Sequence, residues 1–348
     1  MEYPANEETE MKLYVGMDLH STNVVTQIIN EEDNVVYRKK QGCDLDQILK
    51  GLEPFQAEID GIAVESTFNW YWLVDGLMDA GYSIHLVNTA AVKQYEGLKH
   101  TDDNTDAFWL AHLLRLGILP TGYIYPKQTR ALRDLLRKRS QLVQQRTTHI
   151  LSIENLYARN SGSRLSSNAT KRLTREQVEE RFEDANLVLA IESNRLIMNA
   201  LDEQVKVLEQ AVLKQAKLDP RFQCLLTIGG IGNILALTIM LETGTIDRFN
   251  KVGNFTSYCR CVGSEKLSNG KKKGKGNTKN GNKYLSWAFV EAANFAIRFN
   301  EQAKRYYQRK AAKKNRVVAI KAVAHKLARA SYYVMRDQVP FDSTKLFV

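Results

Sequence analysis

The strongest constraint on the fold is a change in the spacing of apolar residues near Pro126. Before this point, apolar residues form short runs bounded by Gly, Asn and Asp, which is typical of strands. After it, they recur at every third or fourth position, as on one face of a helix. The chain is 348 residues long and 44% apolar, enough for two or three packed domains. We therefore predict an α/β domain at 1–125, a helical arm at 126–220 and a mostly helical domain at 221–348.

The first domain contains five strand-like runs, with helices predicted at 45–52 and 70–80. The runs are Leu13–Met17, Val24–Ile29, Val35–Tyr37, Ile59–Val64 and Ile84–Val87. Three strands joined by short turns, followed by strands that alternate with helices, give the strand order of a ribonuclease H-like (RuvC-like) fold. Many α/β domains begin in the same way, so this order alone is weak evidence.

The predicted arm consists of two long helical stretches separated by the polar segment 160–168. In the second stretch, apolar residues are spaced 4, 3 and 4, as along the seam of a coiled coil. These residues are Leu201, Val205, Leu208 and Val212. The arm is either a coiled-coil dimerisation hairpin or a helical bundle packed on the chain's own core, and the sequence favours neither.

The third domain opens with a glycine-rich turn, Thr227 to Asn233, after Pro220 ends the arm. A turn of this kind between two short helices is typical of a helix-hairpin-helix, in which the N–H groups near Gly230 and Gly232 can hold a phosphate. Two helical stretches follow, at 284–300 and 301–335.

The net charge of +10 and the pI of about 9.3 indicate a polyanionic partner, either nucleic acid or an anionic membrane surface. We predict two basic surfaces that bind nucleic acid. Their members include Arg130, Arg133 and Arg137 on the long helix, and Lys313, Lys314 and Arg316 in a segment without acidic residues between Glu301 and Asp337.

No apolar run approaches the ~20 residues of a membrane span, and nothing resembles a secretory signal. We expect a cytoplasmic, nucleoid-associated protein whose four scattered cysteines are reduced and structural.

A glycine-rich basic loop, Val262 to Gly281, lies between predicted helices. Glycines let the backbone approach a phosphate closely, and lysines supply positive charge. The lysines are Lys271, Lys272, Lys273, Lys275 and Lys279. Ser264 or Ser268 offers a hydroxyl, so the loop can handle a phosphodiester; the alternative is a solvated lysine run.

Four carboxylates are suitably placed to hold divalent metal ions. Asp18 follows the first strand and Glu65 ends a buried strand, so both would emerge at one edge of the sheet. Asp103 and Asp106 are three residues apart at a helix start and project from one face. Asp102 is an alternative to Asp103, or the N-cap of that helix. Each acid alone is more often a cap or a solvated side chain, but the combination favours a site for phosphoryl transfer.

The chain resembles a DEDD transposase of the insertion-sequence one-ten family, the bridge-RNA-guided recombinases. The matching motifs extend over nearly the whole chain. They are Val-Gly-Met-Asp18, Ala-Val-Glu65-Ser, Asp103-x-x-Asp106-Ala, Ile-Gly-Gly-Ile-Gly232 and Val-Gly-Ser-Glu-Lys-Leu-Ser268-Asn-Gly. The resemblance implies a RuvC-like domain, a coiled-coil arm and a C-terminal transposase domain whose serine attacks DNA.

We therefore expect a DNA transposase that exchanges phosphodiesters with the help of two Mg²⁺ ions, for which Mn²⁺ can substitute. The expected metal ligands are Asp18, Glu65, Asp103 and Asp106. Ser268 is the expected nucleophile, preferred over Ser264 because Asn269 and Gly270 follow it. The expected partners are donor and target DNA, a structured bridge RNA and further copies of the chain in a dimer or tetramer. The alternatives are a four-carboxylate endonuclease of the Holliday-junction resolvase type that uses water, and a non-catalytic RNA- or DNA-binding scaffold.

Overall fold

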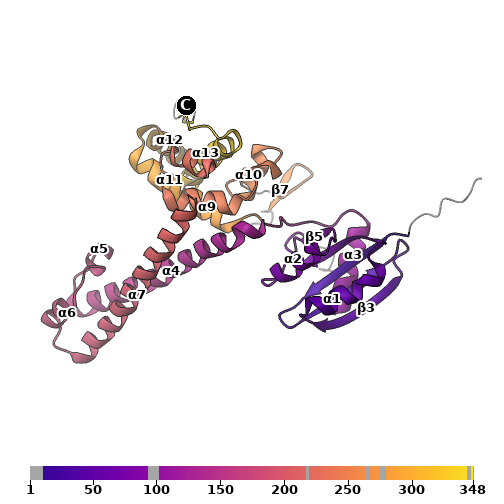
Figure 1. Ribbon diagram of the computed structural model, residues 1–348. Helices are drawn as coiled ribbons and strands as arrows, with labels where there is room; N and C mark the ends of the chain where they lie inside the picture. The colour runs from indigo at the N-terminus through magenta and orange to yellow at the C-terminus, as the bar shows by residue number, and fades with distance from the viewer. Residues whose placement is uncertain are drawn as a thin grey trace, which may run out of the picture. The chain divides into compact units, whose positions relative to one another are not determined.

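A computed structural model describes residues 11–92, 102–216, 219–263, 266–274, 280–342 and 346–347. The chain divides into two compact units, residues 1–127 and 128–348 (Figure 1). The first unit contains a five-stranded sheet with helices, and the second is almost entirely helical. The mixed α/β start and helical remainder predicted from the sequence are confirmed.

The sheet of the first unit has the strand order β3-β2-β1-β4-β5. Strand β2 is antiparallel to β1 and β3, whereas β1, β4 and β5 are parallel, an arrangement consistent with a ribonuclease H-like fold. The elements are β1 Leu13–Leu19, β2 Asn23–Ile29, β3 Val35–Gly42, α1 Leu45–Leu52, η1 Glu53–Phe55, β4 Ile59–Glu65, α2 Tyr71–Asp79, β5 Ile84–Val87 and α3 Asp103–Arg115. All five strands lie where the apolar runs predict them.

The two faces of the sheet carry different helices. Alternate residues of β1, including Val15 and Met17, pack into a core with α1 and α2. On the other face, Gly16 lies against α3, and a Cβ atom at Gly16 would come within 1.9 Å of the Ala107 carbonyl oxygen. Only glycine permits this approach of α3 to β1, because any side chain would overlap the helix backbone.

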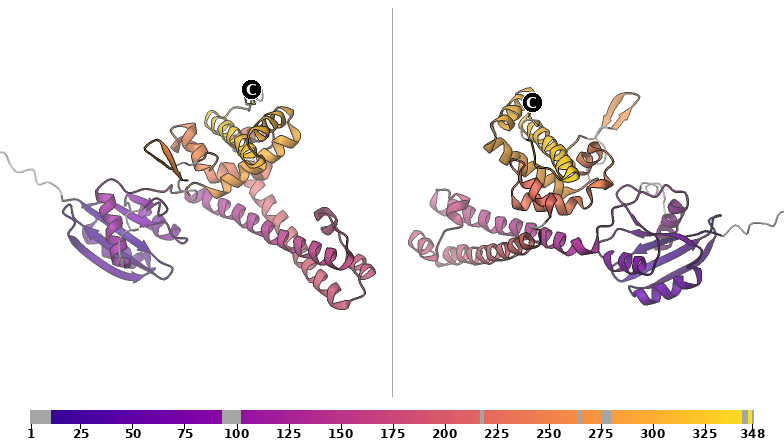
Figure 2. Two further views of the ribbon diagram at one scale, coloured as in Figure 1. Left: turned by 180° about the vertical axis from the view of Figure 1, so that it is seen from behind. Right: turned by 45° about the horizontal axis from the view of Figure 1, so that its top comes forward.

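The second unit begins with the arm, in which α4 (Lys127–Ser161) and α7 (Ala185–Ala216) lie side by side (Figures 1 and 2). The short helices α5 (Ser167–Thr170) and α6 (Arg175–Arg181) connect them at the far end. Polar contacts run along the pair: Arg139 binds Glu209, and His149 lies 2.9 Å from Asn194.

The apolar seam of the arm packs within the chain. Val205 and Val212 are 3% and 0% exposed, and Val212 belongs to the core of the C-terminal helices. Of the two alternatives for the arm, the burial of Val205 and Val212 by the chain's own residues favours the bundle packed within the chain.

The rest of the second unit packs around one apolar core. Its elements are α8 Pro220–Leu226, α9 Asn233–Thr243, η3 Ile246–Arg248, α10 Val252–Tyr258, β6 Lys266–Ser268, β7 Lys271–Gly274, α11 Lys283–Phe299, α12 Glu301–Lys313 and α13 Arg316–Asp337. Asn282, Asn300 and Asn315 cap α11, α12 and α13, each accepting hydrogen bonds from backbone N–H groups of the first turn. The single helical stretch predicted at 301–335 is thus two helices, because Asn315 starts a new one.

A buried ion pair joins the arm to this core. Glu242 of α9 is 1% exposed and accepts hydrogen bonds from Arg137 of α4, at 2.6 and 2.7 Å, and from Asn282, at 2.7 Å. A buried carboxylate is tolerated only when it is paired in this way. The base of the arm is therefore fixed to the C-terminal helices.

Substituting Gly16 tests the close approach of α3 to β1. Gly16→Ala should lower the free energy of unfolding by about 1–3 kcal/mol, the usual range for an overpacked core. Gly42→Ala is the matched control, since a Cβ atom there meets no atom within 4 Å. Urea unfolding of the two variants provides the measurement, and equal stability would contradict the structure at this contact.

Candidate active site

The register of the sheet places Asp18 and Glu65 side by side. In the parallel pair of β1 and β4, Met17 lies opposite Val64, so the next residue on each strand is an acid. Both acids are on the face that Gly16 and Ala63 present to α3. Asp18 is only 3% exposed, which is rare for a carboxylate.

Helix α3 adds Asp106 to these two carboxylates. Asp106 precedes Ala107, whose carbonyl oxygen lies over Gly16, so the close helix–strand contact positions the acid. Asp18, Glu65 and Asp106 line one cavity of about 230 Å³, together with Val87, Thr89, Val92 and Leu110. Three of the four acids predicted from the sequence thus share a small, partly apolar cavity.

The crowding of these acids changes their protonation. Burial, a hydrogen bond with Asp18 and the charges of Asp18 and Asp106 raise the pKa of Glu65 to about 8. Burial and then the charges of Asp18, Asp103 and Asp102 raise the pKa of Asp106. A bound cation would relieve this repulsion, so the donor set fits a divalent metal ion.

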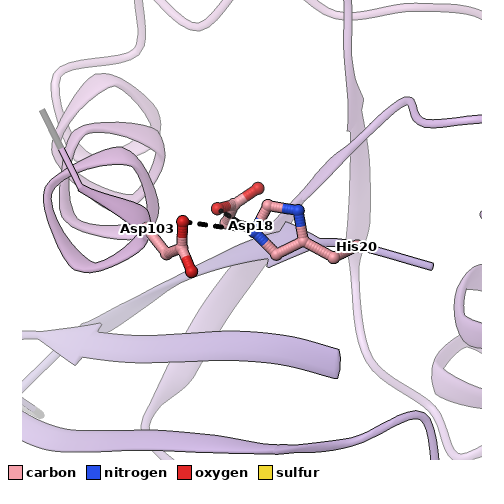
Figure 3. Close-up of side chains that lie close together, drawn as sticks. All are labelled: Asp18, His20 and Asp103. Carbon is pink, nitrogen blue, oxygen red and sulfur yellow. Dashed lines mark ion pairs between the residues drawn. The ribbon is translucent and has the colours of Figure 1, made fainter. Parts of the chain in front are cut away.

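Asp103 lies next to a second group of side chains (Figure 3). The Nε2 atom of His20 is 3.1 Å from Asp18 Oδ2 and 3.4 Å from Asp103 Oδ1, and Lys40 Nζ is 2.8 Å from Asp103 Oδ2. The hydrogen bond from Lys40 is the largest cause of the lowered pKa of Asp103. Ligand atoms of Asp18, His20 and Asp103 all lie within 4.8 Å of one another, which suggests a divalent-metal site.

Asp102 has the capping role that the sequence left open. Its carboxylate accepts a hydrogen bond from the Thr105 backbone N–H at 2.7 Å and from the Thr105 hydroxyl at 2.6 Å. Asp102 is therefore the N-cap of α3. The residue at which the helix starts sets the direction in which Asp103 and Asp106 point.

Sequence reasoning missed His20 and Lys40. His20 is two residues after Asp18, at the end of β1, a position that could have indicated a polar neighbour of the site. Lys40 comes from β3, and no sequence signal links it to Asp103, 63 residues away.

Ser268 lies in a β-hairpin, not in the open loop that the sequence predicted. It ends β6 and pairs with Lys271 of β7. Asn269 and Gly270, with φ of 50° and 69°, form the turn. This Asn-Gly turn is a strong hairpin signal that the sequence analysis overlooked. Ser268, Lys271 and Lys273 are exposed, whereas Ser264, Lys275, Lys279 and the Lys272 side chain lie outside the described residues.

The structure covers most of the predicted basic surface on α4. Arg130 and Arg133 are 5% and 4% exposed, and Arg137 binds the buried Glu242. Arginines that are buried or paired in this way are structural. In contrast, Lys313, Lys314 and Arg316, where α12 meets α13, are exposed.

The glycine turn between α8 and α9 lies against α11. A Cβ atom at Gly230, whose φ is 99°, would come within 2.5 Å of the Ala292 carbonyl oxygen. Gly232 is the exposed N-cap of α9 and has no side chain to cap the helix. The phosphate-binding role of this turn stays a prediction.

Comparison with known families identifies the class of protein. A DEDD transposase model of the IS110 group matches residues 15–158, which include Asp18, Glu65, Asp103 and Asp106. A second model, described as the transposase IS116/IS110/IS902 family, matches residues 222–308, which include Ser268. The chain is therefore a transposase, an enzyme that cleaves and rejoins DNA. It belongs to the IS110 family of DEDD transposases. A search of curated proteins finds no match.

The part of the chain that the structure describes contains no helix long and apolar enough to cross a membrane.

The raised pKa of Glu65 gives a testable dependence of stability on pH. Its value of about 8 exceeds the ordinary 4.5, so the folded state binds this proton more tightly than the unfolded state. Without metal, the stabilising contribution is therefore present below pH 4.5 and is lost as the pH rises through about 8. Glu65→Gln should remove this part of the pH dependence.

Urea unfolding in a chelator at pH 6 and pH 9 provides the measurement. Glu65→Gln should gain stability relative to the unmodified protein at the higher pH, whereas exposed Glu32→Gln should not. A Glu65→Gln difference that is the same at both pH values would overturn this account of the cluster.

Proposed function

We propose that this transposase cleaves and exchanges DNA strands in a reaction that depends on Mg²⁺ and uses a serine nucleophile. The observation that carries the proposal is the cavity lined by Asp18, Glu65 and Asp106, with Asp103 beside it. Such a cluster of acids on one face of a sheet suits phosphoryl transfer, which needs hard oxygen ligands for its metal ions.

Two overlapping groups of side chains are suited to hold the metal. The first consists of Asp18, Glu65 and Asp106, and the second of Asp18, Asp103 and His20. Because Asp18 belongs to both, the arrangement supports a site for two ions. Carboxylate ligands favour Mg²⁺ or Mn²⁺. When bound, such ions polarise the phosphate and stabilise the charge that develops during displacement.

The other residues of the site hold the acids in place. Lys40 orients Asp103 through a hydrogen bond of 2.8 Å, and Asp102 fixes the start of α3. Gln27 of β2 donates a hydrogen bond to the Asn104 carbonyl oxygen at 2.6 Å, which attaches the same turn of α3 to the sheet. These contacts would keep the carboxylates preorganised for ligand binding.

Ser268 is the proposed nucleophile. Its Oγ would form a bond to phosphorus while the bond to a deoxyribose oxygen breaks; the serine loses its proton to a base and the leaving oxygen gains one. The phosphoserine ester conserves the bond energy, so rejoining needs no external energy source. Exposed Lys271 and Lys273 in the same hairpin would attract the phosphate.

The family resemblance and the surface charge support a bridge RNA as guide. Exposed cations line α12 and the start of α13 and would bind an RNA backbone. They are Lys304, Arg305, Arg309, Lys310, Lys313, Lys314, Arg316 and Lys321. Assembly into a dimer or tetramer is supported by exposed apolar residues of α7, Leu189, Leu196 and Ile197, which are 67%, 57% and 47% exposed.

Removing one carboxylate tests the metal site. Asp106→Asn should reduce strand cleavage by roughly 100-fold or more, the order expected when a stabiliser of transition-state charge is lost. DNA binding should stay nearly unchanged, because the basic surfaces are intact. Asp102→Asn is the matched control, since asparagine caps a helix as well as aspartate does. Cleavage of labelled donor DNA measures the effect, and equal activity of the two variants would remove Asp106 from the site.

Removing the hydroxyl tests the nucleophile. Ser268→Ala should form no covalent protein–DNA adduct, whereas Ser264→Ala should still form it. Denaturing electrophoresis of enzyme incubated with labelled donor DNA detects the adduct. An adduct that persists in Ser268→Ala and vanishes in Ser264→Ala would make Ser264 the nucleophile. Efficient cleavage by the unmodified enzyme without any adduct would instead indicate a nuclease that uses water.

A further inference from the structure

The second unit contains a cavity of about 660 Å³ that the proposed cleavage reaction does not use. Its walls come from α12, α13, the segment 339–342 and Leu346, near the C-terminus in Figure 1. The volume is within the ~300–1,000 Å³ of typical small-molecule sites. Its lining combines cationic and aromatic side chains.

One face of α13 supplies most of the polar lining. His325, Arg329 and Tyr333 are spaced four residues apart, so they lie in a row along the helix and all line the cavity. Tyr333 is 40% exposed, and Arg329 is also exposed. A planar ring and a guanidinium are therefore both accessible from solvent.

Positive charge is concentrated around a second ring, that of Tyr306 on α12. Lys326 Nζ lies 5.0 Å from the ring centroid, Lys310 Nζ 5.5 Å and the Arg309 guanidinium carbon 6.0 Å. Burial and the nearby charges of Arg309, Lys310 and Arg329 lower the pKa of Lys326. Among the lining residues, Asp342 is the only acid. Such an excess of cations would be relieved by an anion.

The chain holds the far wall of the cavity in place. Lys326 donates a hydrogen bond to the Leu346 carbonyl oxygen at 2.5 Å, and the Phe341 backbone N–H donates to the Thr227 hydroxyl at 2.7 Å. The ring of Phe347 also lies 5.9 Å from that of Tyr306. These contacts hold the wall formed by residues 339–342 and Leu346 against the rest of the second unit.

We propose that this cavity binds one unpaired nucleotide of a nucleic-acid strand, with its base against Tyr333 and its phosphate near Arg329 and His325. Aromatic rings stack on any base, and arginine and lysine attract the phosphate, a combination typical of sites for single strands. A duplex has no free base to insert. The inference rests on the proposed nucleic-acid function and adds a second contact, separate from the carboxylates.

The test measures binding of a short single strand to the full-length protein. The strand carries a fluorescent label for anisotropy, and one adenine is replaced by a fluorescent purine analogue whose emission falls on stacking. Tyr333→Ala should weaken binding about tenfold, the order of one lost base–aromatic stack, and should abolish the fall in emission. Tyr333→Phe should preserve both, because the ring remains. Arg329→Ala should weaken binding and reduce its dependence on salt.

Arg298→Ala is the matched control: Arg298 is an exposed arginine of α11 in the same unit that does not line the cavity. Circular dichroism of each variant verifies folding. An equal loss in Arg298→Ala and Arg329→Ala, with Tyr333→Ala unaffected, would overturn the proposal in favour of general charge attraction. Duplex binding that weakens equally in Tyr333→Ala would overturn it in favour of a duplex groove.

Parallel experiments distinguish the source of the nucleotide. DNA and RNA strands of the same sequence show which strand binds more tightly, and a preference for either supports the proposal. Competition by adenosine monophosphate as strong as that by the oligonucleotide would overturn it in favour of a free nucleotide. Cleavage by the carboxylate site is measured separately, so failure here would leave the effect of Asp106→Asn on cleavage intact.

Discussion

The close contact between Gly16 of β1 and Ala107 of α3 is the constraint on which the candidate active site depends. The absence of a side chain at Gly16 lets the helix backbone lie directly on the strand. Asp106 is the neighbour of Ala107, and Asp18 is two residues after Gly16 on the same face, so a single packing contact brings acids from two distant segments together. The parallel register of β1 and β4 then adds Glu65.

The carboxylate cluster of the sheet unit and the basic surface of α12 and α13 have opposite charge, which suits the binding of metal ions by the first and of nucleic acid by the second. The sheet unit gathers carboxylates whose burial and mutual repulsion raise the pKa of Glu65 and Asp106, and a divalent cation would offset this cost. The end of the helical unit gathers lysines and arginines with few acids, a surface that attracts phosphates. Lys40 partly neutralises Asp103, and the His20 ring lies close to both Asp103 and Asp18.

The outcome for individual residues shows which kinds of prediction succeed. Asp18 and Glu65 were placed correctly at one sheet edge because each lies at the end of an apolar run that marks its strand, and the two strands are adjacent and parallel. The arginines of α4 were misjudged because helical spacing places residues on one face but does not say what covers that face. The acid that pairs with Arg137 is Glu242, 105 residues later in the chain. The hairpin at Ser268 was missed although its Asn-Gly turn is a local signal.

The sequence by itself determined the five strands of the sheet, the two long helices of the arm and the places of the four acids at strand ends or a helix start, because each depends on local periodicity or on neighbouring residues. Only the tertiary structure decided that Asp106 lies in the cavity with Asp18, that His20 and Lys40 accompany Asp103, and that Arg130 and Arg133 are buried. It also decided that Val205 and Val212 pack against the chain's own helices. Contacts between distant segments depend on how whole elements pack, and the free energy of that packing is distributed over many residues, so no short pattern contains it.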